Sequence, residues 1–170
     1  MKTLKVLVTA GATNIPIDKV RVISNIFHGR TGTEIARYFA EQGHKVTLIT
    51  SSPRLAEGSD NLKIVKYSTY QDLAKLMSRQ IRKGGYDLII HSAAVSDYFC
   101  AGTYTRCEHG GELYKVDGGG KIHSHHPELY LKLQPTKKLV DQIRSKWGFK
   151  GKLVKFKLEV GKNDDELISI

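Results

Sequence analysis

Short apolar segments alternate with amphipathic segments along this chain, and that order restricts the fold more than any other feature. Residues 4–8 form a β-branched run that stops at Ala10-Gly11, which predicts a buried strand. Further strands are predicted over residues 45–50, 62–65, 86–91, 129–133 and 153–158, and helices over 32–42, 69–83, 136–146 and from Asn163 onward. Such alternation is typical of an α/β fold, here a Rossmann-like, doubly wound, mostly parallel sheet in a single domain of residues 1–170.

The boundaries of two helices carry recognisable signals. Gly43 is a natural end for the helix of residues 32–42, and Thr69-x-x-Asp72 resembles a capping box at the start of the next helix. Between residues 98 and 126 the chain is rich in Gly, His and Tyr and has no helical period. We expect that segment to be irregular.

A long glycine-rich loop follows the first predicted strand. Gly11, Gly29 and Gly32 would let backbone N–H groups face a ligand, and the following helix adds a partial positive charge beside Arg30, as in a phosphate-binding cradle. The alternative is a structural glycine-rich connection. Gly11 and Gly29 are 18 residues apart, so this is not the compact dinucleotide fingerprint, and the chain contains no P-loop motif.

The sequence argues against a nicotinamide-dependent oxidoreductase. The second predicted strand ends in Thr50-Ser51-Ser52, without the acid that would hold the ribose hydroxyls. None of the eight tyrosines has a lysine four residues later, so the Tyr-x-x-x-Lys pair of short-chain dehydrogenases is missing.

A segment of small residues follows the strand predicted over residues 86–91. Ser92 and Ala93 would allow a flat group to approach the backbone, and Asp97 can accept hydrogen bonds from a ribose or hold a phosphate-bound metal. A tight turn with a capping aspartate explains the same residues equally well.

The charge of the chain suggests anionic partners. Lys and Arg number 27 against 17 Asp and Glu, giving a net charge of +10, but no run of five like charges is present. A solvated surface is the first reading of this excess, phosphate-ligand binding the second and nucleic-acid binding the third. We therefore expect no nucleic-acid partner and, since no apolar run approaches the ~18–20 residues of a span, no membrane partner.

Cysteine and histidine usage adds little chemistry. Cys100 and Cys107 cannot build a disulfide framework, which fits a cytoplasmic location. The spacing of His123, His125 and His126 is not that of zinc ligands, so we read a solvated polar loop and predict no metal-ligating residues.

Three motifs in order resemble the phosphopantothenate–cysteine ligase family, also called phosphopantothenoylcysteine synthetase. The loop AGATNIPIDKVRVISNIFHGRTG is similar to that family's Gly-Gly-Thr turn followed by Pro-(Ile/Leu)-Asp-x-Val-Arg, Ile-(Ser/Thr)-Asn and Ser-x-Gly-x-x-Gly. SAAVSDY resembles its Ala-Ala-Val-(Ala/Ser)-Asp-Tyr segment, and VKFKLE resembles a strand of its monofunctional and eukaryotic branch. Lys121-Ile122 stands where the family has a Lys-Ile pair after a variable loop.

The resemblance implies a reaction and its partners. The family joins L-cysteine to 4′-phosphopantothenate in coenzyme A biosynthesis, with CTP or ATP as co-substrate and Mg²⁺, through an acyl-nucleotidyl anhydride. The resemblance also implies a homodimer, whose two copies would pair through residues 98–133.

The same resemblance assigns roles to individual residues. Asn25 would stabilise the activated intermediate, and Lys121 would contact the nucleotide and its phosphates. The remaining positions would bind the nucleotide: Gly11, Gly29, Gly32, Ser92, Ala93, Asp97, Lys138, Leu139 and Phe156.

The chain also departs from the family pattern. His28 stands where serine is usual, His123 and Ser124 follow Lys121-Ile122 where many relatives have lysines, and Lys137 replaces a common proline. The chain ends at Ile170, so we expect the C-terminal part of the family domain to be absent. The alternative function is a non-catalytic module that binds a nucleotide or a flavin phosphate.

Overall fold

A five-stranded parallel sheet forms the body of the computed structural model, which describes residues 2–106, 111–116 and 119–157. Its strands are β1 (Lys5–Ala10), β4 (Lys45–Thr50), β5 (Leu62–Lys66), β6 (Leu88–His91) and β10 (Lys152–Lys155). They lie in the order β10-β6-β1-β4-β5, every neighbouring pair is parallel, and the predicted Rossmann-like sheet is confirmed. The strand order reverses direction between β1 and β6, which is where ligands bind in sheets of this kind.

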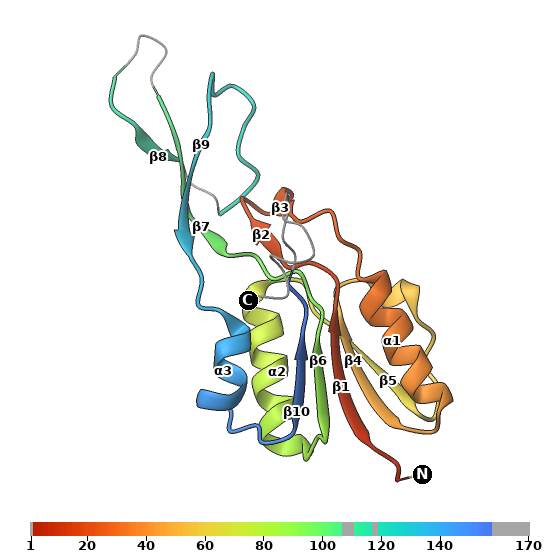
Figure 1. Cartoon of the computed structure of the whole chain (residues 1–170). Coiled ribbons are helices and arrows are strands. Elements are labelled where there is room, and N and C mark those ends of the chain that lie inside the picture. Colours follow the sequence, from red (N-terminus) through yellow and green to blue (C-terminus); the bar gives the residue numbers. More distant parts are fainter. Residues whose placement is uncertain (1, 107–110, 117–118, 158–170) are drawn as a thin grey trace, which may run out of the picture.

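Helices cover both faces of this sheet (Figure 1). One face lies against α1 (Arg30–Glu41), with Val8, Ala36 and Leu48 in a shared core. The other lies against α2 (Tyr70–Gly84) and α3 (Leu139–Ser145), with Leu7, Met77 and Ile143 fully buried between them. Because β1 and β4 contribute to both cores, their near-continuous apolar sequences are explained.

Two smaller β structures stand beyond the carboxyl ends of the parallel strands (Figure 1). The glycine-rich loop contains an antiparallel hairpin of β2 (Asn14–Pro16) and β3 (Val22–Ser24). A three-stranded antiparallel sheet combines β7 (Tyr98–Thr105), β8 (Tyr114–Val116) and β9 (Tyr130–Pro135), and it projects away from the body. A short 3₁₀ helix, η1 (Pro53–Leu55), follows β4.

Most predicted elements are present with shifted ends. The helix expected from residue 32 begins at Arg30, and the helix expected over 136–146 is shortened to Leu139–Ser145. The expectation of an irregular segment over 98–126 was wrong for β7 and β8. Strand β7 has a register shift between Cys100 and Gly102, which interrupts the alternation that would otherwise reveal it. The helix predicted from Asn163 onward lies outside the described residues, and so does Cys107.

None of the helices in the described ranges is long and apolar enough to cross a membrane.

The start of α2 offers a test of the predicted capping box, which the structure confirms. Thr69 Oγ1 accepts a hydrogen bond from Asp72 N at 3.2 Å, and Asp72 Oδ2 accepts one from Thr69 N at 2.9 Å. We predict that Thr69→Ala lowers the free energy of unfolding by about 1 kcal/mol, measured by urea denaturation, because it leaves a helix N–H unpaired. Thr69→Ser keeps the hydroxyl and serves as the control; equal stability of the alanine variant and wild type would contradict the prediction.

Candidate functional site

Two loops pair where the strand order reverses. Ser92 N donates to Thr9 O at 3.2 Å, and Ala94 N donates to Gly11 O at 2.9 Å. Thr13 N donates in return to Ala94 O at 3.2 Å. The loop after β6 therefore continues the β1–β6 pairing past both strand ends, and it brings Ser92 and Ala93 beside the glycine-rich turn.

The glycines of the long loop allow α1 to begin directly against the end of β1. Gly29 has a φ of 84°, and a Cβ there would lie 2.2 Å from the backbone N of Gly11. A Cβ on Gly32 would lie 2.8 Å from Ala10 Cβ and 3.2 Å from Ser92 Oγ. No side chain fits at either position. These glycines serve backbone packing, so their contact with a ligand stays a prediction that depends on the N–H groups of the first turn of α1.

Asn25 lies at the same junction. It follows β3, and its Nδ2 donates to Ala94 O at 3.4 Å while the side chain stays exposed. The β2–β3 hairpin returns the chain to this point, so the 17 residues between Gly11 and Gly29 carry Asn25 over the end of β1.

Asp18 and Arg21 connect the hairpin to the segment that carries Lys121. The buried Asp18 carboxylate accepts hydrogen bonds from the N–H groups of Val20 and Arg21, from the Arg21 guanidinium and from Ile122 N. Arg21 Nη2 also donates to Ile122 O at 2.7 Å. The hydrogen bond from Arg21, followed by those from backbone N–H groups, holds the pKa of Asp18 well below its usual value. These bonds hold the backbone of Ile122, the residue that follows the exposed Lys121.

Asp97 anchors the connection from β9 to α3 through its backbone. Thr136 N donates to Asp97 O at 2.8 Å, and Thr136 Oγ1 donates to Ser96 O at 2.7 Å. These bonds bring the exposed Lys138 toward the loop after β6. Leu139, by contrast, is only 1% exposed and packs in the core, so it can approach a ligand only through its backbone.

Phe156 lies at the carboxyl end of β10. Its N–H donates to His91 O at 3.2 Å, and its ring is 52% exposed. Phe156 and Asp97 therefore both lie close to β6, one at its end and one on the loop that follows it.

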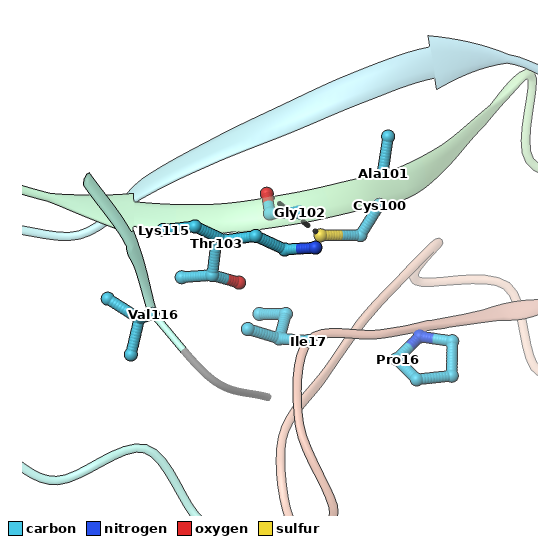
Figure 2. Close-up of a pocket in the computed structure, with 8 residues that line it drawn as sticks. All are labelled: Pro16, Ile17, Cys100, Ala101, Gly102, Thr103, Lys115 and Val116. Atoms are coloured by element: carbon cyan, nitrogen blue, oxygen red, sulfur yellow. Dashed lines mark hydrogen bonds between the residues drawn. The ribbon is translucent and has the colours of Figure 1, made fainter. Parts of the chain in front are cut away.

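A separate pocket of about 470 Å³ lies between the hairpin and the three-stranded sheet (Figure 2). Its lining residues are Pro16, Ile17, Cys100, Ala101, Gly102, Thr103, Lys115 and Val116. None of them belongs to the predicted site. Among the described residues, no group of three or more His, Cys, Asp or Glu side chains could hold a metal, and the exposed His123 ring stacks on His125 with centroids 5.6 Å apart.

Sequence reasoning missed the roles of Asp18, Arg21 and Thr9. The opposite charges of Asp18 and Arg21, three residues apart in a turn, were an available signal. Their partner Ile122 is 104 residues from Asp18, and no local pattern reveals such a contact.

The hydrogen bonds of Asp18 yield a prediction about the segment that carries Lys121 and Ile122. Asp18→Asn replaces one acceptor oxygen with a donor amide, so it weakens the bonds to Arg21 and to Ile122 N. We expect amide hydrogen exchange at Ile122 to accelerate by about tenfold or more, measured by mass spectrometry, with little change in β1. Glu34→Gln, which breaks the exposed pair with Arg37, is the matched control. Unchanged exchange at Ile122 would show that Asp18 does not hold this segment.

Comparison with known proteins gives a consistent result. The family model described as the DNA/pantothenate metabolism flavoprotein C-terminal domain matches residues 1–166. The coenzyme A biosynthesis bifunctional protein CoaBC of Thermococcus kodakarensis is 32% identical over 165 residues, which are 97% of this chain and 36% of the relative. Its counterpart in Methanocaldococcus jannaschii is 31% identical over 166 residues, again 97% of this chain and 36% of the relative. The chain thus spans little more than a third of these curated relatives.

A solved structure shares the fold. The DNA/pantothenate metabolism flavoprotein from Streptococcus pneumoniae superposes with a TM-score of 0.83 at 31% identity, covering 98% of this chain and 75% of the other. With almost its whole length matched by one family model, the chain belongs to the family of the DNA/pantothenate metabolism flavoprotein C-terminal domain.

Proposed function

We propose that this chain acts as a phosphopantothenate–cysteine ligase of coenzyme A biosynthesis. The observation that carries the proposal is the junction at the strand-order reversal, where the glycine-rich turn, Asn25 and the loop after β6 meet. Membership of a pantothenate-metabolism family, and relatives named for coenzyme A biosynthesis, support the same conclusion.

A nucleoside triphosphate, CTP or ATP, would bind across this junction. The first turn of α1 offers unpaired N–H groups and the Arg30 side chain to the phosphates. Thr33 Oγ1, in the same helix, is the one fully enclosed side-chain oxygen or nitrogen without a partner in the described ranges, which fits a polar ligand or water nearby. Lys121 and Lys138 would add positive charge at the same edge, and exposed Phe156 offers an apolar surface to the base or ribose.

Mg²⁺ would enter with the triphosphate. It is usually held by one or two carboxylates together with substrate phosphates, and exposed Asp97 is the carboxylate among the predicted site residues. Bound there, the ion would neutralise charge on the phosphates.

The reaction has two steps. The carboxylate of 4′-phosphopantothenate attacks the α-phosphorus of the nucleotide, forming an acyl-nucleotidyl anhydride and releasing pyrophosphate. The amine of L-cysteine then attacks the acyl carbon, forms the amide and expels the nucleoside monophosphate. Asn25, beside the loop that would hold the nucleotide, is suited to donate a hydrogen bond to oxygen atoms that gain negative charge.

We further propose that the protein works as a homodimer. Exposed aromatic and aliphatic side chains on the three-stranded sheet support this assembly: Tyr98, Phe99, Tyr114, Tyr130 and Leu133. A cytoplasmic location remains part of the proposal.

The proposed activity predicts a strict substrate requirement. Phosphopantothenoylcysteine should form only when 4′-phosphopantothenate, L-cysteine, Mg²⁺ and CTP or ATP are all present, with product detected by mass spectrometry and pyrophosphate by a coupled assay. Nucleotide binding by calorimetry without any turnover would instead identify a non-catalytic binding module, and failure to bind either nucleotide would exclude both readings.

The role of Asn25 predicts a separation of the two steps. Asn25→Ala should slow amide formation by about 10²–10³-fold and let the anhydride accumulate, because the variant lacks one donor to the intermediate. Rapid-quench analysis by mass spectrometry measures both species. Asn61→Ala is the control, since Asn61 bonds Lys45 and Ala40 away from the junction. Amide formation at the wild-type rate would remove Asn25 from the mechanism.

A further inference from the structure

A buried histidine at the end of β6 has no place in the reaction described above. His91 is 8% exposed, and its Nδ1 lies 2.8 Å from Thr9 Oγ1, on the neighbouring strand β1. Thr9 is completely buried and is the register partner of His91 in the parallel sheet. The pair therefore lies at the strand-order reversal, beneath the loop that carries Ser92 and Ala93.

The hydrogen bonds around Thr9 favour one tautomer of this histidine. Thr9 Oγ1 accepts a hydrogen bond from Ala93 N at 3.3 Å, so its own proton is available to His91 Nδ1. A hydroxyl that donates to Nδ1 requires that nitrogen to be unprotonated, which leaves the ring proton on Nε2. Burial also lowers the pKa of His91 to about 4, so the ring is neutral at neutral pH.

The Nε2–H group is left without a protein acceptor in the described part of the chain. The hydrogen bond to Thr9 uses Nδ1 alone. Among the described residues, the one fully enclosed side-chain oxygen or nitrogen without a partner is Thr33 Oγ1, so Nε2 of His91 is not in that class. His91 keeps 8% of its surface exposed, and Nε2 is the ring nitrogen for which the described residues supply no partner. A buried ring donor without a protein partner among the described residues calls for another acceptor, and a bound ligand can supply it.

The face of the sheet on which His91 lies indicates which part of a nucleotide it could contact. Side chains alternate along β6, and Ile89 packs against α2 and α3, so His91 faces the same side. Its register partner on β10, the exposed Lys155, also faces that side. The glycine junction and the start of α1 belong to the opposite side, where phosphates are expected. A nucleotide whose phosphates meet α1 can therefore reach His91 only if its nucleoside crosses the end of β6 to the α2 and α3 side.

We propose that His91 binds the nucleoside part of the nucleotide by donating its Nε2–H to an acceptor atom there, a base oxygen, ring nitrogen or ribose oxygen. This proposal rests on the proposed function, because it places the nucleoside on the α2 and α3 side of the same site. Thr9 acts on the nucleotide only through His91 and is a positioning residue.

Two substitutions distinguish the contributions of Nδ1 and Nε2 of the His91 ring. In His91→Asn the amide oxygen can replace Nδ1 as the acceptor for Thr9, but the side chain is too short to reach the position of Nε2. In His91→Gln the amide N–H can reach that position, while the contact with Thr9 is lost. If His91 binds the nucleoside, the asparagine variant should bind nucleotide about three- to tenfold more weakly and the glutamine variant should bind within about twofold of wild type.

Calorimetry with CTP and ATP measures these affinities, and inorganic triphosphate serves as the matched ligand without a nucleoside. Affinity for triphosphate should be the same in all three proteins. Wild-type nucleotide affinity in the asparagine variant, or an equal loss for triphosphate, would overturn the proposal. If wild type forms product and the asparagine variant binds nucleotide with wild-type affinity, only the role of His91 fails. If wild type binds neither nucleotide, the proposed function fails as well.

A measurement on wild type guards against variants that do not fold. In ¹⁵N-labelled protein at pH 7, the His91 ring should show a protonated Nε2 and an unprotonated Nδ1. The Nε2 proton should shift on addition of nucleotide and remain in place on addition of triphosphate. A ring protonated at Nδ1, or an Nε2 signal that ignores the nucleotide, would also overturn the proposal.

Discussion

The close approach of two backbone segments, at Gly29 and Gly11, organises this molecule. Since a Cβ at Gly29 would lie within 2.2 Å of a backbone nitrogen, the start of α1 can reach the end of β1 only because side chains are missing there. The approach places the first turn of α1 over the strand-order reversal. It also leaves the hairpin between the two glycines to project outward, with Asn25 directly after its returning strand β3. Close packing of backbone, rather than direct ligand contact, is the first requirement that these glycines meet.

Local sequence patterns were sufficient for the body of the fold. The β-branched runs of β1 and β4 and the capping residues Thr69 and Asp72 are short-range signals, and each appears in the structure where it was expected. The antiparallel sheet was harder, because the bulge near Gly102 breaks its alternation and its strands pair with partners distant in sequence. Patterns that depend on long-range pairing are weak in a single sequence.

The proximity of several predicted site residues could be expected from the sequence, but their geometry only in part. Ser92, Asn25 and Gly32 gather near one edge because the carboxyl ends of parallel strands meet there. Leu139 shows where such reasoning stops. It is adjacent to exposed Lys138 in sequence, yet the rotation of α3 buries it completely. Burial of one residue within a short helix depends on packing against α2, which a motif does not encode.

The Asp18 carboxylate ties together two parts of the chain that are 104 residues apart. It closes the turn of the hairpin through Val20 and Arg21, and it also seats Ile122 beside that turn. The hairpin turn and the segment at Ile122 therefore depend on each other for their hydrogen bonds. An exchange of hairpins between distant homologues would transfer Asp18 and Arg21 without their partner Ile122. A working chimera therefore has to include the Lys121 segment together with the hairpin.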